Sequence, residues 1–226
     1  MIIGAMQPHF MPAAGYFGLL KNVDVFVMLD SVQYDKRSWQ QRNYFIINGQ
    51  KKYLTVPTLV KGKSTQKINQ VIIDKSSDYI SKHLKTIELN YKKNLNFKII
   101  FENIKKIYNN NFHLLSDLNI ELIKYFCKLL KIETKIVLLS DLNLSGSKEI
   151  LIHNLCMKLN CTKYVSTIGS QDYLSRIKDN KYKILYYDFN YQPYENCSFS
   201  GLSTLDTIIR LNEKTNDYID SNFIIN

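Results

Sequence analysis

The 226-residue sequence lacks the long apolar stretches that would place it in a membrane. No segment approaches the roughly 20 consecutive apolar residues that a transmembrane helix needs. The chain begins with a strand-like run and has no basic region of the kind that opens a signal peptide. We therefore expect a cytoplasmic protein without a transmembrane segment.

Cysteine is scarce, and its spacing excludes the common metal sites. The four cysteines form no C-x-x-C pair and no metal-ligand spacing. Cys127 and Cys156 lie among helical apolar residues, which is typical of buried free thiols. A Walker loop, a G-x-G-x-x-G fingerprint and a Ser/His/Asp order are also absent. The sequence gives no support to a metal site, a metal mechanism or a covalent hydrolase mechanism.

Arginine is rare in a chain that is otherwise basic. The formal net charge is +10, yet only four of the 30 basic residues are arginine. Arginine reads phosphates and bases better than lysine does, and the lysines here are scattered singly or in pairs. We expect a solvated basic surface and no nucleic-acid partner, although the charge stays compatible with a pocket for a phosphorylated small molecule.

Strand-like and helix-like segments alternate along most of the chain. Apolar runs at 1–6, 25–29, 135–139, 162–166 and 182–187 are separated by stretches with helical spacing. This alternation predicts an α/β fold with a mostly parallel open sheet of the Rossmann-like type.

Other segments add to this frame. The runs 44–47 and 53–56, joined by Asn48-Gly49, predict a β-hairpin. A further short strand is expected at 68–73. From about 76 to 131 the apolar spacing changes to three and four residues, which predicts three helices, the first capped by Ser76 or Ser77. We find no repeats or linker, so we predict a single α/β domain over 1–226 with a helical insertion at about 76–131.

Polar side chains gather where the first two predicted strands end. Gln7, Pro8 and His9 follow the first strand, and Asp30 follows the second. Pro8 and Pro12 stiffen the first of these loops. In an open parallel sheet, ligands bind in the crevice beyond the carboxyl ends of the strands. The sequence therefore predicts an active-site edge here.

Motifs that start in this loop continue along nearly the whole chain. They are Gln7-Pro8 with Pro12 and Gly15-Tyr16-Phe17, Asp24-Val25-Phe26-Val27, Asp30-Ser31-Val32-Gln33-Tyr34, Trp39 with Arg42-Asn43, Thr55-Val56-Pro57, His83, Tyr91-Lys92, Lys148, Tyr164-Val165-Ser166, Gly169, Tyr173-Leu174 and Leu202-Ser203-Thr204-Leu205-Asp206. Together they resemble the WbqC-like protein family, found in gene clusters for bacterial O-antigen and related surface polysaccharides. The chain departs from the family pattern at Ala13-Ala14, at Thr167 and after Asp206.

The N-terminal loop also resembles a second group of enzymes. In nucleotidyltransferase-like enzymes, including amide-forming ligases such as pantothenate synthetase, a His-x-Gly-His loop holds the triphosphate at a helix N-terminus. His9 and Gln7 could take the donor roles here, and Gly15 would let the backbone approach the ligand. Tyr16 stands where the second histidine would fall. This second resemblance implies a nucleotidyltransferase-like variant of the fold as an alternative, with ATP as one candidate cofactor.

Three residues are the candidates for catalysis, and two of them have a structural alternative. His9 either touches substrate or hydrogen-bonds to backbone. Asp30 is either a general base or amine-orienting carboxylate, or a cap for the turn at Ser31-Val32. Gln7, with backbone N–H groups, would steady developing charge.

The candidates for substrate binding also have structural alternatives. Arg37 and Arg42 could clamp a diphosphate bidentately or be solvated charges. Lys148 lies in a helix first turn and either meets a phosphate or is exposed. Trp39 is either a platform for a ring or part of the core, and His83 is either a site residue or a core histidine. The remaining substrate-binding candidates are Pro8, Tyr16, Gln33, Tyr34, Lys36, Asn43, Ser166, Gly169 and Tyr173.

The resemblance implies a role in making polysaccharide precursors. Our leading hypothesis is an enzyme that transfers an acyl or aminoacyl group to the amine of a nucleotide-linked amino sugar. The donor stays open between an acyl thioester and ATP plus an amino acid. The alternatives are a non-catalytic binding or scaffold protein of polysaccharide assembly and an ATP-dependent amide ligase. The sequence leaves the oligomeric state unassigned.

Overall fold

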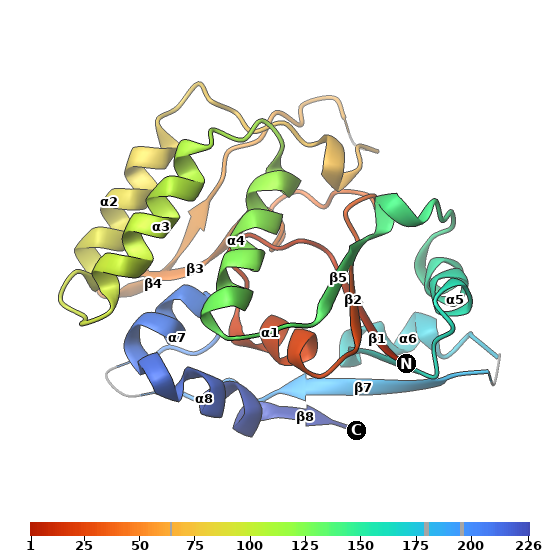
Figure 1. Cartoon of the computed structure of the whole chain (residues 1–226). Helices are drawn as coiled ribbons and strands as arrows, with labels where there is room; N and C mark the ends of the chain where they lie inside the picture. The colour runs from red at the N-terminus through yellow and green to blue at the C-terminus, as the bar shows by residue number, and fades with distance from the viewer. Residues whose placement is uncertain (64, 179–180, 195–196) are drawn as a thin grey trace.

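A mostly parallel sheet organises the molecule, as the computed structural model shows for residues 1–63, 65–178, 181–194 and 197–226 (Figure 1). Its strands are β1 (Ile2–Met6), β2 (Val25–Met28), β5 (Lys135–Leu138), β6 (Lys163–Thr167), β7 (Lys183–Phe189) and β8 (Phe223–Ile225). The spatial order is β5-β2-β1-β6-β7-β8, and only the β7–β8 pairing is antiparallel. Counted along the chain, the five parallel strands lie in the order 3-2-1-4-5. This is the doubly wound, Rossmann-like order, which confirms the predicted fold class.

The central strands are buried on both faces, as parallel strands covered by helices should be. Ile3 and Ala5 of β1 pack into one core, and Phe26 and Met28 of β2 pack into the other. All four residues of β2 are buried. These runs of apolar residues therefore have no polar face, in contrast to strands that border solvent.

Helices cover both faces of the sheet (Figure 1). One core includes residues of α1 (Ala14–Lys21), α4 (Leu115–Leu129), α7 (Thr204–Leu211) and α8 (Thr215–Asn222). The other includes residues of α5 (Lys148–Lys158) and α6 (Gln171–Leu174). Short 3-10 turns are η1 (Ile68–Gln70), η2 (Leu139–Leu142), η3 (Ile168–Ser170) and η4 (Asn212–Lys214).

Two glycines let α1 lie very close to the C-terminal strands. A Cβ atom at Gly15 would come within 2.9 Å of Phe189 Cβ, and one at Gly18 would come within 2.5 Å of the Phe223 ring. A larger residue at either position would push α1 away from β7 or β8. The N-terminus of α1 is thus held in place beside the end of the sheet.

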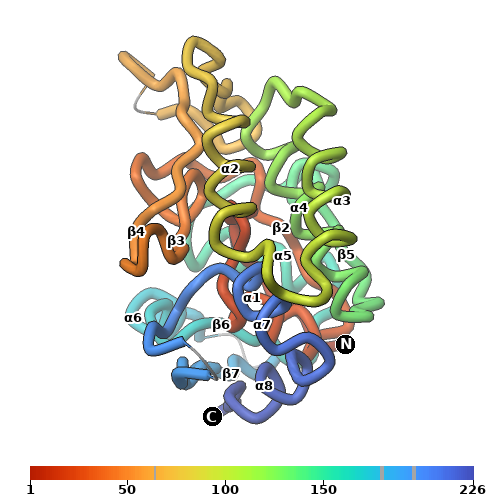
Figure 2. Tube along the Cα trace, turned by 90° about the vertical axis from the view of Figure 1, so that its left-hand side faces the viewer, coloured from red at the N-terminus to blue at the C-terminus, as the bar shows by residue number. Residues whose placement is uncertain are grey.

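A hairpin and a helical block fill the chain between β2 and β5. The hairpin pairs β3 (Arg42–Ile47) with β4 (Gln50–Thr55). Asn48 and Gly49 join them, both with positive φ, as a tight hairpin turn requires. Helices α2 (Tyr79–Tyr91) and α3 (Phe97–Asn109) lie beside α4. Figure 2 shows these three helices in the upper half of the molecule, with the hairpin at one side and α7 and α8 below.

Local details differ from the sequence predictions in three places. The strand expected at 68–73 is the 3-10 turn η1 followed by isolated bridges at Ile72 and Ile73. The cap of α2 is Asp78, whose carboxylate accepts from Ser81 N at 3.1 Å, and not Ser76 or Ser77. The segment after Phe189 forms α7, α8 and β8, for which the sequence analysis made no prediction.

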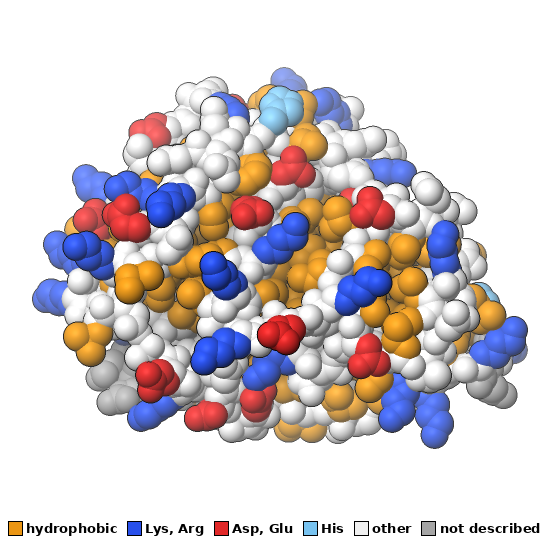
Figure 3. Space-filling view, in the orientation of Figure 1, with side chains coloured by type: hydrophobic (Ala, Val, Ile, Leu, Met, Phe, Trp, Pro, Cys, Tyr) orange, Lys and Arg blue, Asp and Glu red, His pale blue; other side chains and the backbone are white. Residues whose placement is uncertain are grey.

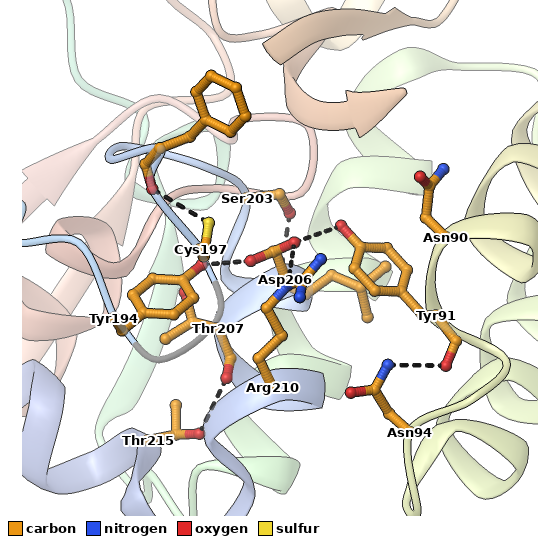
Figure 4. Close-up of polar contacts among 12 residues, drawn as sticks. Asn90, Tyr91, Asn94, Tyr194, Cys197, Ser203, Asp206, Thr207, Arg210 and Thr215 are labelled. Carbon is orange, nitrogen blue, oxygen red and sulfur yellow. Dashed lines mark hydrogen bonds and ion pairs between the residues drawn. The ribbon is translucent and has the colours of Figure 1, made fainter. Parts of the chain in front are cut away.

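A buried carboxylate ties the helical block to the C-terminal segment (Figure 4). Asp206 of α7 is fully buried, and its Oδ2 accepts from Tyr91 of α2 at 2.7 Å and from Arg210 Nε at 3.1 Å. Its Oδ1 accepts from the hydroxyl of Tyr194. Three side chains from three parts of the chain therefore donate to one carboxylate.

The surface is mixed in charge on the face that Figure 3 presents. Basic and acidic side chains alternate there, and hydrophobic side chains gather in the middle, between α4 and β5. Among the described residues, no helix is long and apolar enough to cross a membrane. In the same residues, no three His, Cys, Asp or Glu side chains are grouped as metal ligands.

Candidate functional site

The candidate functional site lies where the strand order of the sheet reverses. β1 continues into a loop and α1, whereas β6 continues into η3 and α6 on the opposite face of the sheet. Such a switch point leaves a crevice at the carboxyl ends of the two strands. Here Met6 of β1 and Thr167 of β6 line a cavity of about 550 Å³. We call it the switch-point cavity.

Three parts of the chain build the walls of this cavity. The loop after β1 and α1 contribute one part, the hairpin region a second, and the segment around and after β7 a third. The lining residues are Met6, His9, Ala13, Tyr16, Trp39, Asn43, Tyr44, Lys51, Thr167, Tyr187, Tyr191, Ser200 and Gly201. His9, Tyr16, Trp39 and Asn43 were candidates from the sequence, and the structure brings these four together.

The loop after β1 is fixed by two buried asparagines. Asn43 Nδ2 donates to the carbonyls of Phe10 at 3.3 Å and Met11 at 2.8 Å. Asn119 of α4 donates to the carbonyls of Pro8 at 2.9 Å and Gln40 at 2.7 Å. Buried carbonyls need such donors, and these bonds hold the loop in one conformation. Asn43 therefore shapes the site mainly through the loop that it holds.

His9 presents a neutral imidazole to the cavity. Burial lowers the pKa of its side chain to about 4. Its ring lies 5.5 Å from that of Tyr16, and none of the described residues hydrogen-bonds to it. At neutral pH His9 can therefore accept a proton or a hydrogen bond from a ligand.

Tyr16 carries a buried hydroxyl without a partner. The residue is 4% exposed, and its Oη makes no hydrogen bond in the described structure. Burial raises the pKa of this phenol well above its ordinary value, so it stays protonated. A buried hydroxyl usually has a partner, so one without a partner in a cavity wall calls for a ligand group.

Aromatic rings form much of the remaining wall. Trp39 is 43% exposed and packs edge-on against Tyr44 at 5.6 Å. Tyr187 and Tyr191 face the cavity from the segment of β7. Such rings offer flat apolar surfaces with polar tips, which suit sugars and nucleobases.

Asp30 lies outside this cavity and has partners of its own. It is 3% exposed, and its two oxygens accept from the N–H of Ser140 at 2.9 Å and from Ser140 Oγ at 2.6 Å. These bonds join the ends of β2 and β5. The carboxylate caps the turn η2 in this structure.

His83 is a core histidine in this structure. Its Nε2 lies 3.0 Å from the carbonyl of Thr55 and its Nδ1 lies 2.9 Å from the hydroxyl of Tyr108. The carbonyl of Thr55 can only accept, so Nε2 carries a proton, and in the neutral ring Nδ1 accepts from the hydroxyl of Tyr108. Burial lowers its pKa to about 4. His83 joins β4, α2 and α3 away from the cavity lining.

The candidate phosphate residues are not brought together. Arg42 stacks over the ring of Tyr53 at 4.0 Å, and Arg37 is exposed in a turn with φ +63°. Lys148 is exposed at the start of α5, also with positive φ. In the described residues, none of these three lines the switch-point cavity.

The other candidates lie around the same edge of the sheet. Gln33, Tyr34 and Lys36 line a separate cavity of about 470 Å³ with the loop near Gly62. Gln7 is half-buried and Pro8 buried directly after β1. Ser166 lies in β6 and accepts from Ser170 Oγ at 2.8 Å. After β6, Gly169 is exposed and Tyr173 is half-buried.

Sequence reasoning missed the residues that the hairpin and the C-terminal segment contribute. Lys51, Tyr44, Tyr191 and Ser200 lie far along the chain from the motif loop, and no local pattern marks them. Met6, Thr167 and Tyr187, at or directly after the ends of predicted strands, carried a usable signal. The cavity depends on tertiary contacts that spacing alone does not encode.

Fold and site together define an open α/β protein with a cavity at its topological switch point. The chain belongs to the WbqC-like protein family, whose model matches residues 7–218. It is 31% identical over 224 residues to the uncharacterized protein Rv1507c of Mycobacterium tuberculosis, and the match covers 96% of both chains. No solved structure matches this chain. The match to the family therefore runs from the motif loop to α8.

Proposed function

We propose that this protein acts in the synthesis of surface-polysaccharide precursors, by transferring an acyl or aminoacyl group to the amine of a nucleotide-linked amino sugar. The reaction would take place in the switch-point cavity. The observation that carries the proposal is the neutral, unpartnered imidazole of His9 in an aromatic-walled cavity at that point of the sheet. The aromatic wall suits a sugar ring, whose C–H faces pack on flat apolar surfaces.

In the proposed reaction the sugar amine attacks the carbonyl carbon of an activated acyl group. A C–N bond forms and the bond from carbon to the thiolate or phosphate leaving group breaks. His9 takes the proton that the amine loses and passes it to the leaving group. Gln7 and backbone N–H groups near the motif loop would stabilise the developing oxyanion. Asp30 is the less suitable base, because Ser140 occupies both of its oxygens.

The test is a mass-spectrometric assay of purified protein with UDP- and dTDP-amino sugars. Each sugar is paired with acetyl-coenzyme A or with amino acids plus ATP. We expect a mass gain on one sugar that equals the transferred group, and the donor required separates thioester from adenylate chemistry. His9→Gln should lower the rate by roughly 100-fold or more. His113→Gln, at an exposed histidine, is the matched control and should leave the rate unchanged.

Two results would contradict the proposal. One is turnover that survives in His9→Gln. The other is an absence of both turnover and ligand retention with every pair, which would favour a binding or scaffold protein of polysaccharide assembly.

A further inference from the structure

Lys51 reaches from the hairpin across the rim of the switch-point cavity. Its ammonium group donates to the carbonyl of Ser200 at 2.5 Å and lies 4.4 Å from the ring centroid of Tyr44. Its neighbours on β4, Gln50 and Lys52, are exposed, whereas Lys51 is half-buried. The side chain is thus held in place by contacts that leave its charge uncompensated.

Among the described residues that line the cavity, Lys51 is the one that carries a formal charge. The other lining residues that the structure describes are aromatic, apolar, amide, hydroxyl or neutral histidine groups, and no carboxylate is among them. Nor does a described carboxylate pair with Lys51. A half-buried cation with only neutral partners favours an anionic ligand, because the anion would offset the cost of its desolvation.

The start of α1 lies on the same cavity. Ala13 is the N-cap residue and lines the cavity, and it offers no side-chain cap to the helix. The first turn of α1 contains no acidic residue. The N–H of Tyr16 donates to the carbonyl of Ala13 at 3.0 Å, so this helix N-terminus favours negative charge mainly through its dipole.

The unpartnered hydroxyl of Tyr16 points independently to a ligand. It belongs to the first turn of α1, is buried in the cavity wall and lacks an acceptor in the described structure. A phosphate oxygen is an acceptor of the right kind. On the hairpin side, the exposed face of Trp39 provides a surface on which a base can stack.

We propose that the switch-point cavity binds a nucleoside diphosphate, with the diphosphate between Lys51 and the N-terminus of α1 and the base against Trp39. This inference rests on the proposed function and assigns the nucleotide to the sugar substrate. It moves the phosphate site from Arg37, Arg42 and Lys148 to a lysine that no sequence motif marks. Gly201, opposite the ammonium group, keeps the space beside it free of a side chain: a Cβ there would lie 3.7 Å from Lys51 Nζ.

Calorimetry with UDP, dTDP, ADP, coenzyme A and uridine tests the assignment. We expect UDP or dTDP to bind the wild-type protein, and Lys51→Gln to weaken that binding at least tenfold. Lys52→Gln, at the exposed neighbour, is the matched control and should change it less than twofold. Lys51→Arg keeps the charge and should restore most of the affinity. Weak uridine binding should not depend on Lys51, since uridine has no phosphate.

Three outcomes would overturn the assignment. They are UDP and dTDP binding that is equal in wild type and Lys51→Gln, no binding of any probe, and Lys51-dependent binding of ADP or coenzyme A without UDP or dTDP, which would give the site to the donor and not to the sugar nucleotide. The transfer assay keeps the two proposals apart. Acyl transfer with an unchanged KM in Lys51→Gln would refute the Lys51 site and leave the proposed function standing. Lys51-dependent UDP binding without acyl transfer would support the Lys51 site and contradict the proposed function.

Discussion

Two buried tyrosine hydroxyls differ in whether they have a partner. Tyr108 Oη hydrogen-bonds to His83 Nδ1, whereas Tyr16 Oη has no partner in the described structure. Both side chains are almost fully buried. A buried hydroxyl without a partner costs free energy of folding, and a protein keeps such a group most readily where a ligand uses it.

Removing each hydroxyl should therefore have opposite consequences. We expect Tyr16→Phe to leave the free energy of unfolding unchanged or raise it by up to about 1 kcal/mol, and to weaken nucleotide binding. Tyr108→Phe should lower stability by about 1–3 kcal/mol, because it leaves His83 Nδ1 unpaired. Urea unfolding and calorimetry measure both effects. A stability loss in Tyr16→Phe as large as that in Tyr108→Phe would mean that the Tyr16 hydroxyl has a structural partner.

His83 makes stability depend on pH on the acidic side. Its pKa is about 4 in the folded protein against 6.5 in the unfolded chain, so the unfolded chain binds the proton first. Stability should be complete above pH 6.5 and fall as the pH drops from 6.5 to about 4, by up to about 3 kcal/mol from this residue. His83→Gln should reduce this fall in urea titrations over that range and leave the part due to His9, whose pKa is also about 4, whereas His113→Gln should retain all of it.

At the scale of elements, the site depends on a loop that other elements hold. Asn119 lies on α4, which is remote in sequence from the motif loop, yet it donates to the carbonyls of Pro8 in that loop and of Gln40 before the hairpin. We expect Asn119→Ala to cost about 2–3 kcal/mol, because two buried carbonyls lose their donor.

The same substitution should also weaken ligand binding, because the loop that carries His9 loses a support. Asn90→Ala is the control. Its side chain bonds only within α2, to the carbonyl of Thr86, so stability should change by about 0.5 kcal/mol or less. Denaturant unfolding and UDP calorimetry on both variants make the comparison. Unchanged stability in Asn119→Ala would show that the loop is held by its other contacts.

The sequence predicted the elements that carry their own signal. Continuous apolar runs, Asn48-Gly49 and helical spacing located the strands β1, β2, β5, β6 and β7, the hairpin and the helices α1 to α6. The strand predicted at 68–73 is wrong, because Ile68 and Val71 are buried at a spacing of three, and a 3-10 turn produces that spacing as well as a strand does.

For the site, the sequence candidates that line the cavity are His9 and Tyr16 near the motif loop and Trp39 and Asn43 near the hairpin. His9 and Tyr16 follow a recognisable strand, so the switch-point rule locates them. Lys51 and Ser200 meet only because the hairpin folds over the segment before α7, a contact between residues 149 positions apart. Such long-range contacts leave no mark in local spacing. For the same reason Asp30 and His83 could not be told from structural groups until their partners Ser140 and Thr55 were known.

At the scale of the whole molecule, Asp206 joins the helical block to the C-terminal segment. Its partners come from α2, from α7 and from the segment after β7. Because this carboxylate is fully buried, its hydrogen bonds are shielded from water, and losing the charge would leave Arg210 poorly compensated. We infer that residues 1–226 unfold as one cooperative unit.

Asp206→Asn tests this inference. We expect a loss of about 3 kcal/mol and a single transition, with the same midpoint by Trp39 fluorescence and far-ultraviolet circular dichroism. Asp220→Asn, which removes a half-exposed partner of Lys21, should cost less than about 1 kcal/mol. Separate midpoints for the two probes would instead indicate that the helical block unfolds on its own.

The central place of β1 has a consequence for synthesis. β1 leaves the ribosome before either neighbour, and β6 follows only after the hairpin and the helical block have been translated. Until then one edge of the middle strand has nothing to pair with, which is the condition under which nascent chains associate with one another or recruit chaperones. The sheet can close only late in translation, so yield in the cell should respond to growth temperature and chaperone supply more strongly than the stability of the finished molecule would suggest.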